Sequence, residues 1–183
     1  TGLSVPEAEG GLGLGDVDWS LMTQELGYYA IPDSLVDVAY IAAGMLAALP
    51  EGHAARAQWL PRIVDGSVRI AVGHPINPWV ADAHLADLLL LPHATPQGLE
   101  LHAVLPAAAN VKTERSIDAS RRLCRVEWHA SAETRIADGA TGQAIWDEAL
   151  ERGALAVAGQ LVGLSQHMLD MTVDYAGQRK QFG

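Results

Sequence analysis

Residues 161–183 read LVGLSQHMLDMTVDYAGQRKQFG, and the organisation of the chain is best understood from this stretch outward. Apolar residues recur along it at helical spacing, which predicts an amphipathic helix. The helical period begins near Thr141 and persists to about Ala176, so the predicted helix spans roughly 50 Å at 1.5 Å per residue. A small domain cannot bury the whole apolar face of such a helix. We therefore expect it to be the first helix of a helical bundle.

Three small residues, Ala156, Gly159 and Gly163, fall on one face of the helix predicted over 141–176. Small side chains allow another backbone to approach closely, either at a helix crossing in water or between helices in lipid. Gln160 and Gln166 favour a crossing in water. The pattern predicts a tight contact between this helix and another segment.

The stretch ends with Gln178, Arg179 and Lys180 close to Phe182, and two interpretations are open. Cations at the carboxyl end of a helix favour its dipole, and a solvated helix end explains these residues. Alternatively, the guanidinium of Arg179 binds a phosphate through two parallel hydrogen bonds, and Phe182 covers a ring. Composition alone favours the first interpretation.

The composition is that of a globular protein with a sizeable core. Of the 183 residues, 49% are hydrophobic and 19% are charged, while aromatic residues make up only 5%. Ala and Leu carry most of the apolar content, which is typical of cores that are helical in good part. The net charge of −10 argues against nucleic acid or an anionic membrane as a partner, because both repel an acidic protein.

Cysteine content and the absence of a long apolar run bound the class of protein further. Cys124 is the single cysteine, which excludes an intrachain disulfide and a cysteine-based zinc site. This fits a reducing compartment, and we expect a cytoplasmic protein. No apolar run reaches the length of a membrane span. The start, Thr1 to Ser4, has no initiator Met and no signal-peptide pattern, and we expect the chain to begin inside a longer protein.

The amino-terminal part has a helical texture behind a glycine-rich entry. We expect Asp18 to cap a helix whose apolar stripe runs from Trp19 to Tyr29. Further helices are predicted over 35–49 and over 54–64, where Pro61 is expected to kink or divide the helix.

From Val68 to about Ile136 short apolar or alternating runs are separated by proline and glycine, as in strands. The predicted strands are 68–72, 88–91, 99–105 and 123–128. The last run alternates, with Cys124, Val126 and Trp128 on one face, so a half-buried strand is predicted. The chain is thus predicted to be α+β, with helical, β and helical parts over 1–66, 67–137 and 138–183.

Several known site types are not supported. The Gly11-Leu-Gly13-Leu-Gly15 run lacks the third glycine of a dinucleotide loop, because Asp16 stands in its place. No G-x-S-x-G motif occurs, and no pair of carboxylates stands out. No metal site is predicted, because the histidines of the β region show no H-x-H or H-x-x-x-H pair. These histidines are His74, His84, His93, His102 and His129.

Four segments, taken in order, resemble the acyl-CoA dehydrogenase family of flavoproteins. VPEAEGGLGLGDVDWSLMTQELG (5–27) resembles the amino-terminal helical segment of the family, and QWLPRIVDGSVRIAVGHP (58–75) resembles the passage into its β-domain. SIDASRRLCRVEW (116–128) resembles a late part of that domain. Residues 161–183 resemble the first helix of the carboxy-terminal bundle. The ending is the most specific match, at Tyr175, Arg179, Gln181, Phe182 and Gly183.

The resemblance implies a fold and an activity. It implies a partial amino-terminal helical domain, a middle antiparallel β-barrel-like domain and the first long helix of a carboxy-terminal four-helix bundle. The family uses FAD to desaturate acyl-CoA thioesters in lipid and fatty acid metabolism, and passes electrons to a flavoprotein acceptor. By resemblance, Arg179, Gln181 and Phe182 contact an FAD held by a neighbouring subunit, in a homo- or hetero-oligomer formed through the carboxy-terminal helices.

The sequence departs from the family pattern at two places. Where the family has Thr-Glu-Pro followed by Gly-Ser-Asp, this chain has Gly73-His74-Pro75 and a shortened loop. The catalytic glutamate of the family usually lies in the bundle, past Gly183, so the catalytic residue is unknown here.

These departures leave three hypotheses. In the first, the chain is part of an acyl-CoA dehydrogenase-like enzyme. In the second, it is a non-catalytic partner subunit that contributes to the FAD site of a neighbouring full-length subunit. The third hypothesis is an interaction module without flavin.

Overall fold

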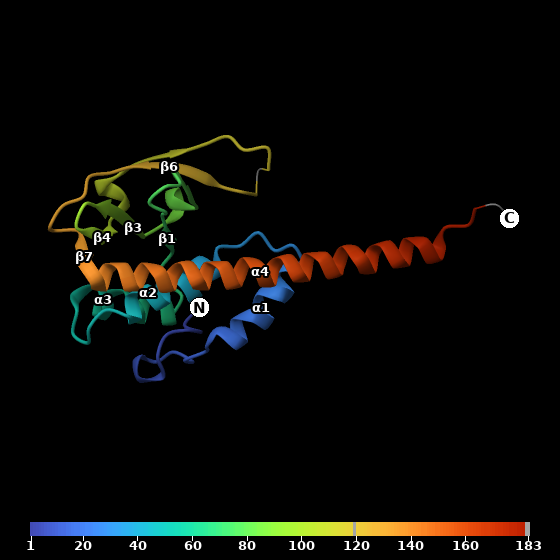
Figure 1. Ribbon diagram of the computed structural model, residues 1–183, viewed down its shortest axis with the longest axis horizontal. Coiled ribbons are helices and arrows are strands. Elements are labelled where there is room, and N and C mark those ends of the chain that lie inside the picture. Colours follow the sequence, from blue (N-terminus) through green and yellow to red (C-terminus); the bar gives the residue numbers. More distant parts are fainter. Residues whose placement is uncertain (119, 182–183) are drawn as a thin grey trace.

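The computed structural model describes residues 1–118 and 120–181. Figure 1 shows the long helix α4 running between the amino-terminal helices on one side and the strands on the other, and then projecting far beyond both. The helices are α1 (Asp16–Tyr28), α2 (Ala43–Ala47), α3 (Ala54–Val64) and α4 (Gly139–Gln178). Shorter helical turns are η1 (Glu7–Glu9), η2 (Asp37–Ala42), η3 (Ala83–Leu85) and η4 (Pro106–Ala108).

The predicted amino-terminal helices are present, with two differences in detail. The helix α1 begins at Asp16, after an extended Gly15, so the prediction that Asp18 caps it is wrong. Asp18 lies in the first turn instead, where its carboxylate accepts the Gly15 N–H at 3.0 Å. The helix α3 has the predicted bounds and continues past Pro61 without division.

The second predicted helix contains an unexpected π-helical turn. Residues 37–42 form η2, and α2 continues directly from it. A π-helical turn has wider hydrogen-bonded rings than an α-helix, and such turns occur frequently at functional sites. Here the turn carries Asp37 at its first position.

The strands form two sheets, and the α+β prediction is confirmed. One sheet has the order β1-β3-β4-β7 and the other the order β2-β6-β5. All pairs are antiparallel except β1 and β3, which run parallel. The strands are β1 (Ile70–Val72), β2 (Trp79–Ala81), β3 (Leu88–Thr95), β4 (Gly98–Val104), β5 (Asn110–Thr113), β6 (Leu123–Glu127) and β7 (Arg135–Ala137). The domain boundaries after residues 66 and 137 stay predictions.

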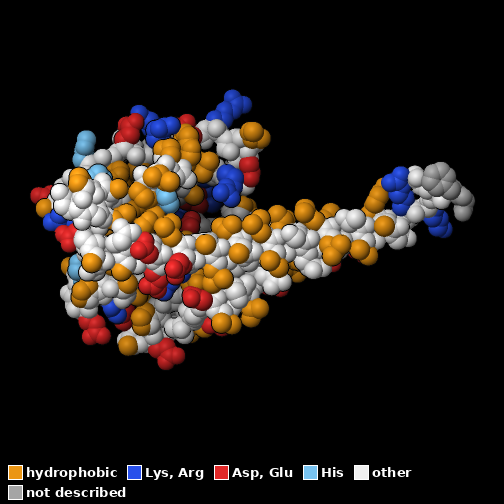
Figure 2. All heavy atoms as spheres, in the orientation of Figure 1, with side chains coloured by type: hydrophobic (Ala, Val, Ile, Leu, Met, Phe, Trp, Pro, Cys, Tyr) orange, Lys and Arg blue, Asp and Glu red, His pale blue; other side chains and the backbone are white. Residues whose placement is uncertain are grey.

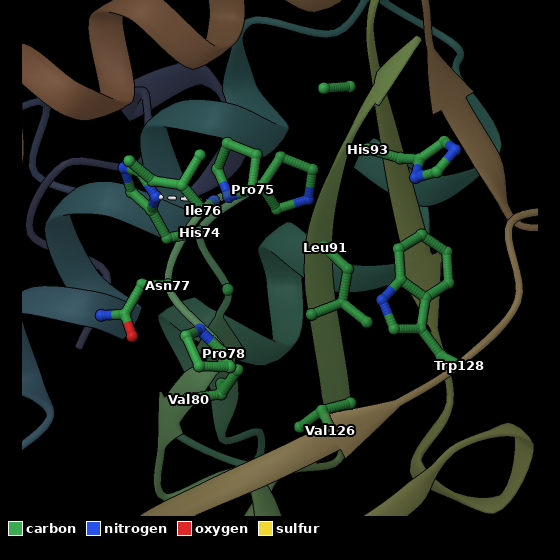
Figure 3. A pocket seen from close by; sticks show the side chains of 13 residues that line it. His74, Pro75, Ile76, Asn77, Pro78, Val80, Leu91, His93, Val126 and Trp128 are labelled. Carbon is green, nitrogen blue, oxygen red and sulfur yellow. Dashed lines mark hydrogen bonds between the residues drawn. The ribbon is translucent and has the colours of Figure 1, made fainter.

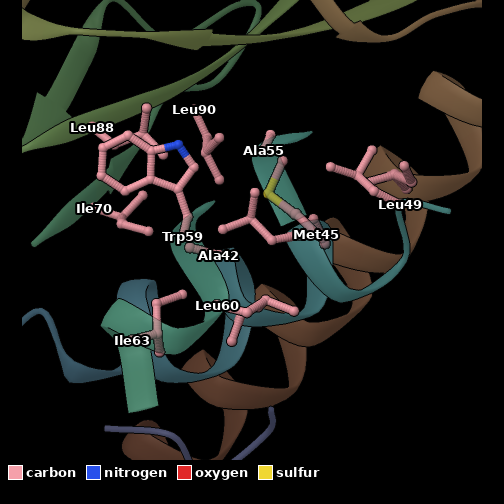
Figure 4. Close-up of a cluster of buried hydrophobic side chains, with 14 of the residues drawn as sticks. Ala42, Met45, Leu49, Ala55, Trp59, Leu60, Ile63, Ile70, Leu88 and Leu90 are labelled. Atoms are coloured by element: carbon pink, nitrogen blue, oxygen red, sulfur yellow. The ribbon is translucent and has the colours of Figure 1, made fainter. Parts of the chain in front are cut away.

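Three apolar cores hold these layers together. The largest lies between α2, α3 and the four-stranded sheet, with Trp59 and Leu60 among its members (Figure 4). A second core lies between the two sheets, and the predicted alternation of β6 is confirmed there, because Cys124, Val126 and Trp128 all belong to it. In the third core, Trp19 of α1 stacks on Tyr40 of η2, with ring centroids 4.7 Å apart.

The predicted tight contact of α4 is a crossing with α1. A Cβ added to Gly163 would lie 1.8 Å from the backbone oxygen of Gln24, and one added to Gly27 would lie 2.0 Å from that of Gln160. Such distances are far below van der Waals contact, so only glycine allows the two backbones to approach this closely. The interpretation of the small-residue face as a tight crossing is confirmed.

Beyond this crossing, α4 leaves a long apolar surface exposed, visible as orange side chains on the projecting rod in Figure 2. The helix has 40 residues, or about 60 Å at 1.5 Å per residue, and is longer than predicted. Nine large apolar side chains from Val157 to Tyr175 are between 38% and 61% exposed: Val157, Leu161, Val162, Leu164, Met168, Leu169, Met171, Val173 and Tyr175. Among the described residues, no helix combines the length and apolarity that a membrane span requires.

Candidate functional site

A large cavity, which we call the amphipathic cleft, has a volume of about 640 Å³. It is lined by residues of α1, η2, the middle of α4 and the segment before β6. Its apolar wall includes Leu26, Val157, Leu161 and Leu164. Its polar corner consists of Asp33, Ser34, Asp37, Asp82, Asp118, Ser120, Arg121 and Arg122. The volume is in the range of small-molecule sites in proteins.

Two carboxylates of the polar corner already have partners. Arg122 forms an ion pair with Asp82, with 3.0 Å between Nη2 and Oδ2, and this pairing raises the pKa of the Arg122 guanidinium. Asp118 accepts hydrogen bonds from Ser120, at 2.6 Å from the hydroxyl and 2.9 Å from the backbone N–H. These bonds lower the pKa of the Asp118 carboxyl, because they stabilise its charged form.

Asp37 differs from these neighbours. Its side chain is half-buried and, among the described residues, makes no hydrogen bond or ion pair. Burial, helped by the nearby Asp82 carboxylate and opposed by the Arg121 guanidinium, raises the pKa of Asp37 to about 6. A carboxyl group perturbed in this way in a cleft is typical of functional sites.

A second, smaller cavity of about 440 Å³ lies between the loop 73–78 and strands β3 and β6. Figure 3 shows the loop side chains, among them His74 and Pro75, facing His93 and Trp128 across this cavity. The loop occupies the place where the sequence departs from the acyl-CoA dehydrogenase pattern. Its lining is mixed, because prolines and apolar side chains stand beside the polar groups of His74, Asn77 and His93.

Some backbone donors of this loop are already used. The N–H of Gly73 donates to the Leu90 carbonyl at 2.9 Å, and the N–H of Ile76 donates to Nδ1 of His74 at 3.3 Å. Just after the loop, the N–H of Trp79 donates to Oδ1 of Asn77 at 3.0 Å. The two prolines of the segment have no N–H to offer. The residues in 73–78 therefore leave few backbone donors for a flavin of the kind that the family pattern implies.

Beside this cavity lies a buried histidine that the sequence did not single out. His102 is 1% exposed, and its Nδ1 lies 2.9 Å from the Thr134 hydroxyl while its Nε2 lies 3.2 Å from the Glu100 carboxylate. Burial lowers the pKa of His102, although Glu100 opposes this shift. Within 1–118 and 120–181 no group of three or more His, Cys, Asp or Glu side chains is placed to hold a metal ion.

Arg179 and Gln181, two of the residues predicted to contact FAD, follow the end of α4, away from the strands in Figure 1. Arg179 comes directly after the last helical residue, and its guanidinium lies over the ring of Tyr175, 5.8 Å from the centroid. Both residues are exposed, and Phe182 lies outside the described residues. The structure therefore does not bring Arg179 or Gln181 to either cavity, and the contact of the three residues with FAD stays a prediction.

The amphipathic cleft was missed by sequence reasoning, although one signal pointed to it. Asp37 is the single charged residue in the otherwise apolar run 35–49. A lone carboxylate in such a helix is costly unless it has a role or a partner. Its neighbours in the cleft come from segments that are distant in sequence.

Comparison with known proteins supports the family resemblance. No protein-family model matches this sequence. Acyl-CoA dehydrogenase IpdE2 of Mycobacterium tuberculosis is 30% identical to the chain over 183 residues, which cover 99% of the chain and 51% of the relative. The chain is related to the acyl-CoA dehydrogenases. The predicted resemblance is confirmed, and the chain spans about half the length of this curated relative.

Solved structures agree with this relationship at the level of the fold. The match to the Tcur3481-Tcur3483 steroid ACAD G363A variant covers 100% of this chain and 55% of that one, with 25% identity and a TM-score of 0.73. The match to the ChsE4-ChsE5 complex from Mycobacterium tuberculosis covers 99% of this chain and 55% of that one, with 20% identity and a TM-score of 0.75. The match to PigA with FAD and proline covers 99% of this chain and 58% of that one, with 17% identity and a TM-score of 0.73. The chain thus has the acyl-CoA dehydrogenase fold.

Proposed function

We propose that this chain is the acyl-binding part of an FAD-dependent acyl-CoA dehydrogenase, which desaturates an acyl-CoA thioester between Cα and Cβ in its full-length or assembled form. The observation that carries the proposal is the amphipathic cleft. Its apolar wall runs along one side of α4 from Val157 to Leu164, where an acyl chain replaces water over exposed leucine and valine side chains.

The chemistry of the reaction needs a flavin and a base, and neither is assigned to this chain. When bound, a flavin would supply the hydride acceptor. Because the loop 73–78 leaves few backbone donors for it, we expect the flavin to be held largely by other segments or another chain. Among the described residues no glutamate lines the cleft, and Glu148 is already paired with Arg152 on α4. What the described residues supply is the binding and exclusion of water around the acyl chain.

The test uses the assembled protein with its flavin. Dodecanoyl-CoA added without oxygen is expected to bleach the flavin absorbance and to yield the enoyl-CoA product. Changing Leu161 to Glu places a charge on the apolar wall of the cleft. We expect acyl-CoA to bind about tenfold more weakly, because the acyl chain no longer buries the apolar surface of one leucine. Leu21→Glu is the matched control, because Leu21 is similarly exposed but lies outside the cleft. Equal effects of the two changes contradict the placement of the acyl chain, and a flavin-free assembly contradicts the proposed chemistry.

A second candidate function is a non-catalytic partner subunit, and a specific observation favours it. The backbone N–H groups of Ile76 and Trp79 donate to the neighbouring side chains of His74 and Asn77. The guanidinium of Arg179, by contrast, is exposed at the far end of α4. A guanidinium fork suits the diphosphate of a dinucleotide in a neighbouring chain. The pairing of two named chains in the ChsE4-ChsE5 complex supports the same idea.

Arg179→Ala in the assembled protein tests this candidate. We expect flavin to dissociate about tenfold more readily, because one charge-assisted contact to phosphate is lost. Lys180→Ala is the control, since it removes an adjacent cation without removing the planar fork. Flavin absorbance after gel filtration measures retention. Unchanged retention in the Arg179 variant contradicts a contact between this chain and the cofactor.

A further inference from the structure

Asp37 is a carboxylate whose position nothing in the proposed reaction explains. It projects from the first position of η2 into the amphipathic cleft, opposite the apolar wall of α4. The neighbouring carboxylates of Asp82 and Asp118 are satisfied by Arg122 and Ser120. Among the described residues, Asp37 has no such partner. A half-buried carboxylate without a protein partner at the edge of a cleft is free to accept a hydrogen bond from a ligand.

Arg121 is the natural counterpart of Asp37 in the cleft. Both residues line it, and the guanidinium acts on the carboxyl through space, yet no ion pair joins them. The side chain of Arg121 likewise makes no hydrogen bond or ion pair within the part of the chain that the structure describes. The cleft therefore presents an acceptor and a donor that face the same space without contacting each other.

A hydroxyl group is a ligand chemistry that satisfies both groups at once. Its hydrogen can be donated to a carboxylate while its oxygen accepts from a guanidinium. An ammonium group would satisfy only Asp37, and a carboxylate would satisfy only Arg121. Because the wall of the cleft on α4 is apolar, the hydroxyl belongs on an otherwise hydrophobic chain.

We propose that Asp37 and Arg121 bind a hydroxyl group carried by the acyl chain, so that the cleft selects hydroxylated acyl groups over plain ones. This inference depends on the proposed acyl-binding function of the same cleft. A site that hydrogen-bonds a hydroxyl discriminates strongly against the analogue that lacks it, because its polar groups are then left without partners.

The experiment compares dodecanoyl-CoA with a series of dodecanoyl-CoAs that each carry one hydroxyl, at positions from C4 to C12. Calorimetric titration of the assembled protein measures the affinities. We expect at least one hydroxylated ligand to bind about tenfold tighter than the plain one, the effect of a hydrogen bond to a charged group. Asp37→Leu should abolish this preference, measured as the ratio of the affinities for the hydroxylated and the plain ligand. Asp118→Asn is the matched control and should keep the preference, because Ser120 already occupies that carboxylate.

Each outcome separates this inference from the function on which it rests. If dodecanoyl-CoA binds and no hydroxylated ligand is preferred, the inference is overturned and the acyl-binding function stands. If Asp37→Leu weakens the plain and hydroxylated ligands equally, Asp37 has a general role and hydroxyl recognition is again overturned. If no acyl-CoA binds to the wild type, the proposed function fails and the inference fails with it. A preference that disappears only in the Asp37 variant supports the inference.

Discussion

Replacing Gly163 by Val is expected to lower the free energy of unfolding by about 3 kcal/mol or more. At this position even a Cβ would lie 1.8 Å from the backbone oxygen of Gln24 and 2.7 Å from the backbone nitrogen of Tyr28. Both atoms belong to the backbone of α1, so no side-chain rotation relieves the clash. The two helices have to separate, and the packing of α1 against α4 is lost. Chemical denaturation followed by circular dichroism measures the change.

Gly177→Ala is the control for this prediction. Gly177 lies in the same helix, and a Cβ added there meets nothing within 4 Å. We expect it to be neutral or to stabilise the helix by about 0.5–1 kcal/mol, the difference in helix propensity between the two residues. A Gly163 variant as stable as the Gly177 variant would show that α1 and α4 do not cross closely in solution.

The second large effect is expected for Trp19→Ala, at about 3–5 kcal/mol of unfolding free energy. Trp19 is fully buried, stacks on Tyr40 and donates from Nε1 to the Ser4 hydroxyl at 2.6 Å. Removing the indole leaves a cavity between α1 and η2 and leaves the hydroxyl without its donor. Because η2 carries Asp37, the shape of the amphipathic cleft should change with it.

Trp79→Ala provides the comparison for the second prediction. Trp79 is 36% exposed on β2, where the Arg125 guanidinium lies 4.7 Å from its ring centroid. A partly exposed ring of this kind is expected to contribute about 1 kcal/mol. Thermal unfolding of both variants, with acyl-CoA binding measured on each, distinguishes the two positions. Equal destabilisation would contradict the assignment of Trp19 to a core that organises the cleft.

The elements that local chemistry specifies could be predicted from the sequence. Apolar residues at helical spacing in 54–64 and 141–176 indicate helices because one face must be buried in either case. The alternation in 123–128 indicates a strand for the same reason, with a period of two. The glycines at 159 and 163 indicated a close crossing, because only glycine tolerates it. The family resemblance likewise depends on local motifs, above all the ending that includes Arg179.

Three features were decided only by the tertiary structure. The strands β2, β5 and β7 have three or four residues each, too few for a period to be recognised, and they exist because longer strands offer them an edge. The parallel pairing of β1 with β3 follows from the path of the chain between them. The π-helical turn at η2 is likewise not indicated by its residues, which are compatible with an ordinary α-helix.

The amphipathic cleft shows this division most clearly. The sequence by itself determined that Asp37 is a lone carboxylate in an apolar run and that α4 has an apolar face. It did not determine that α1, η2, α4 and the segment with Arg121 meet around one cavity. Helical and strand periods depend on neighbours a few residues away. A cleft depends on contacts between segments more than a hundred residues apart, such as those of Leu26 and Leu164, which form only when the whole chain packs.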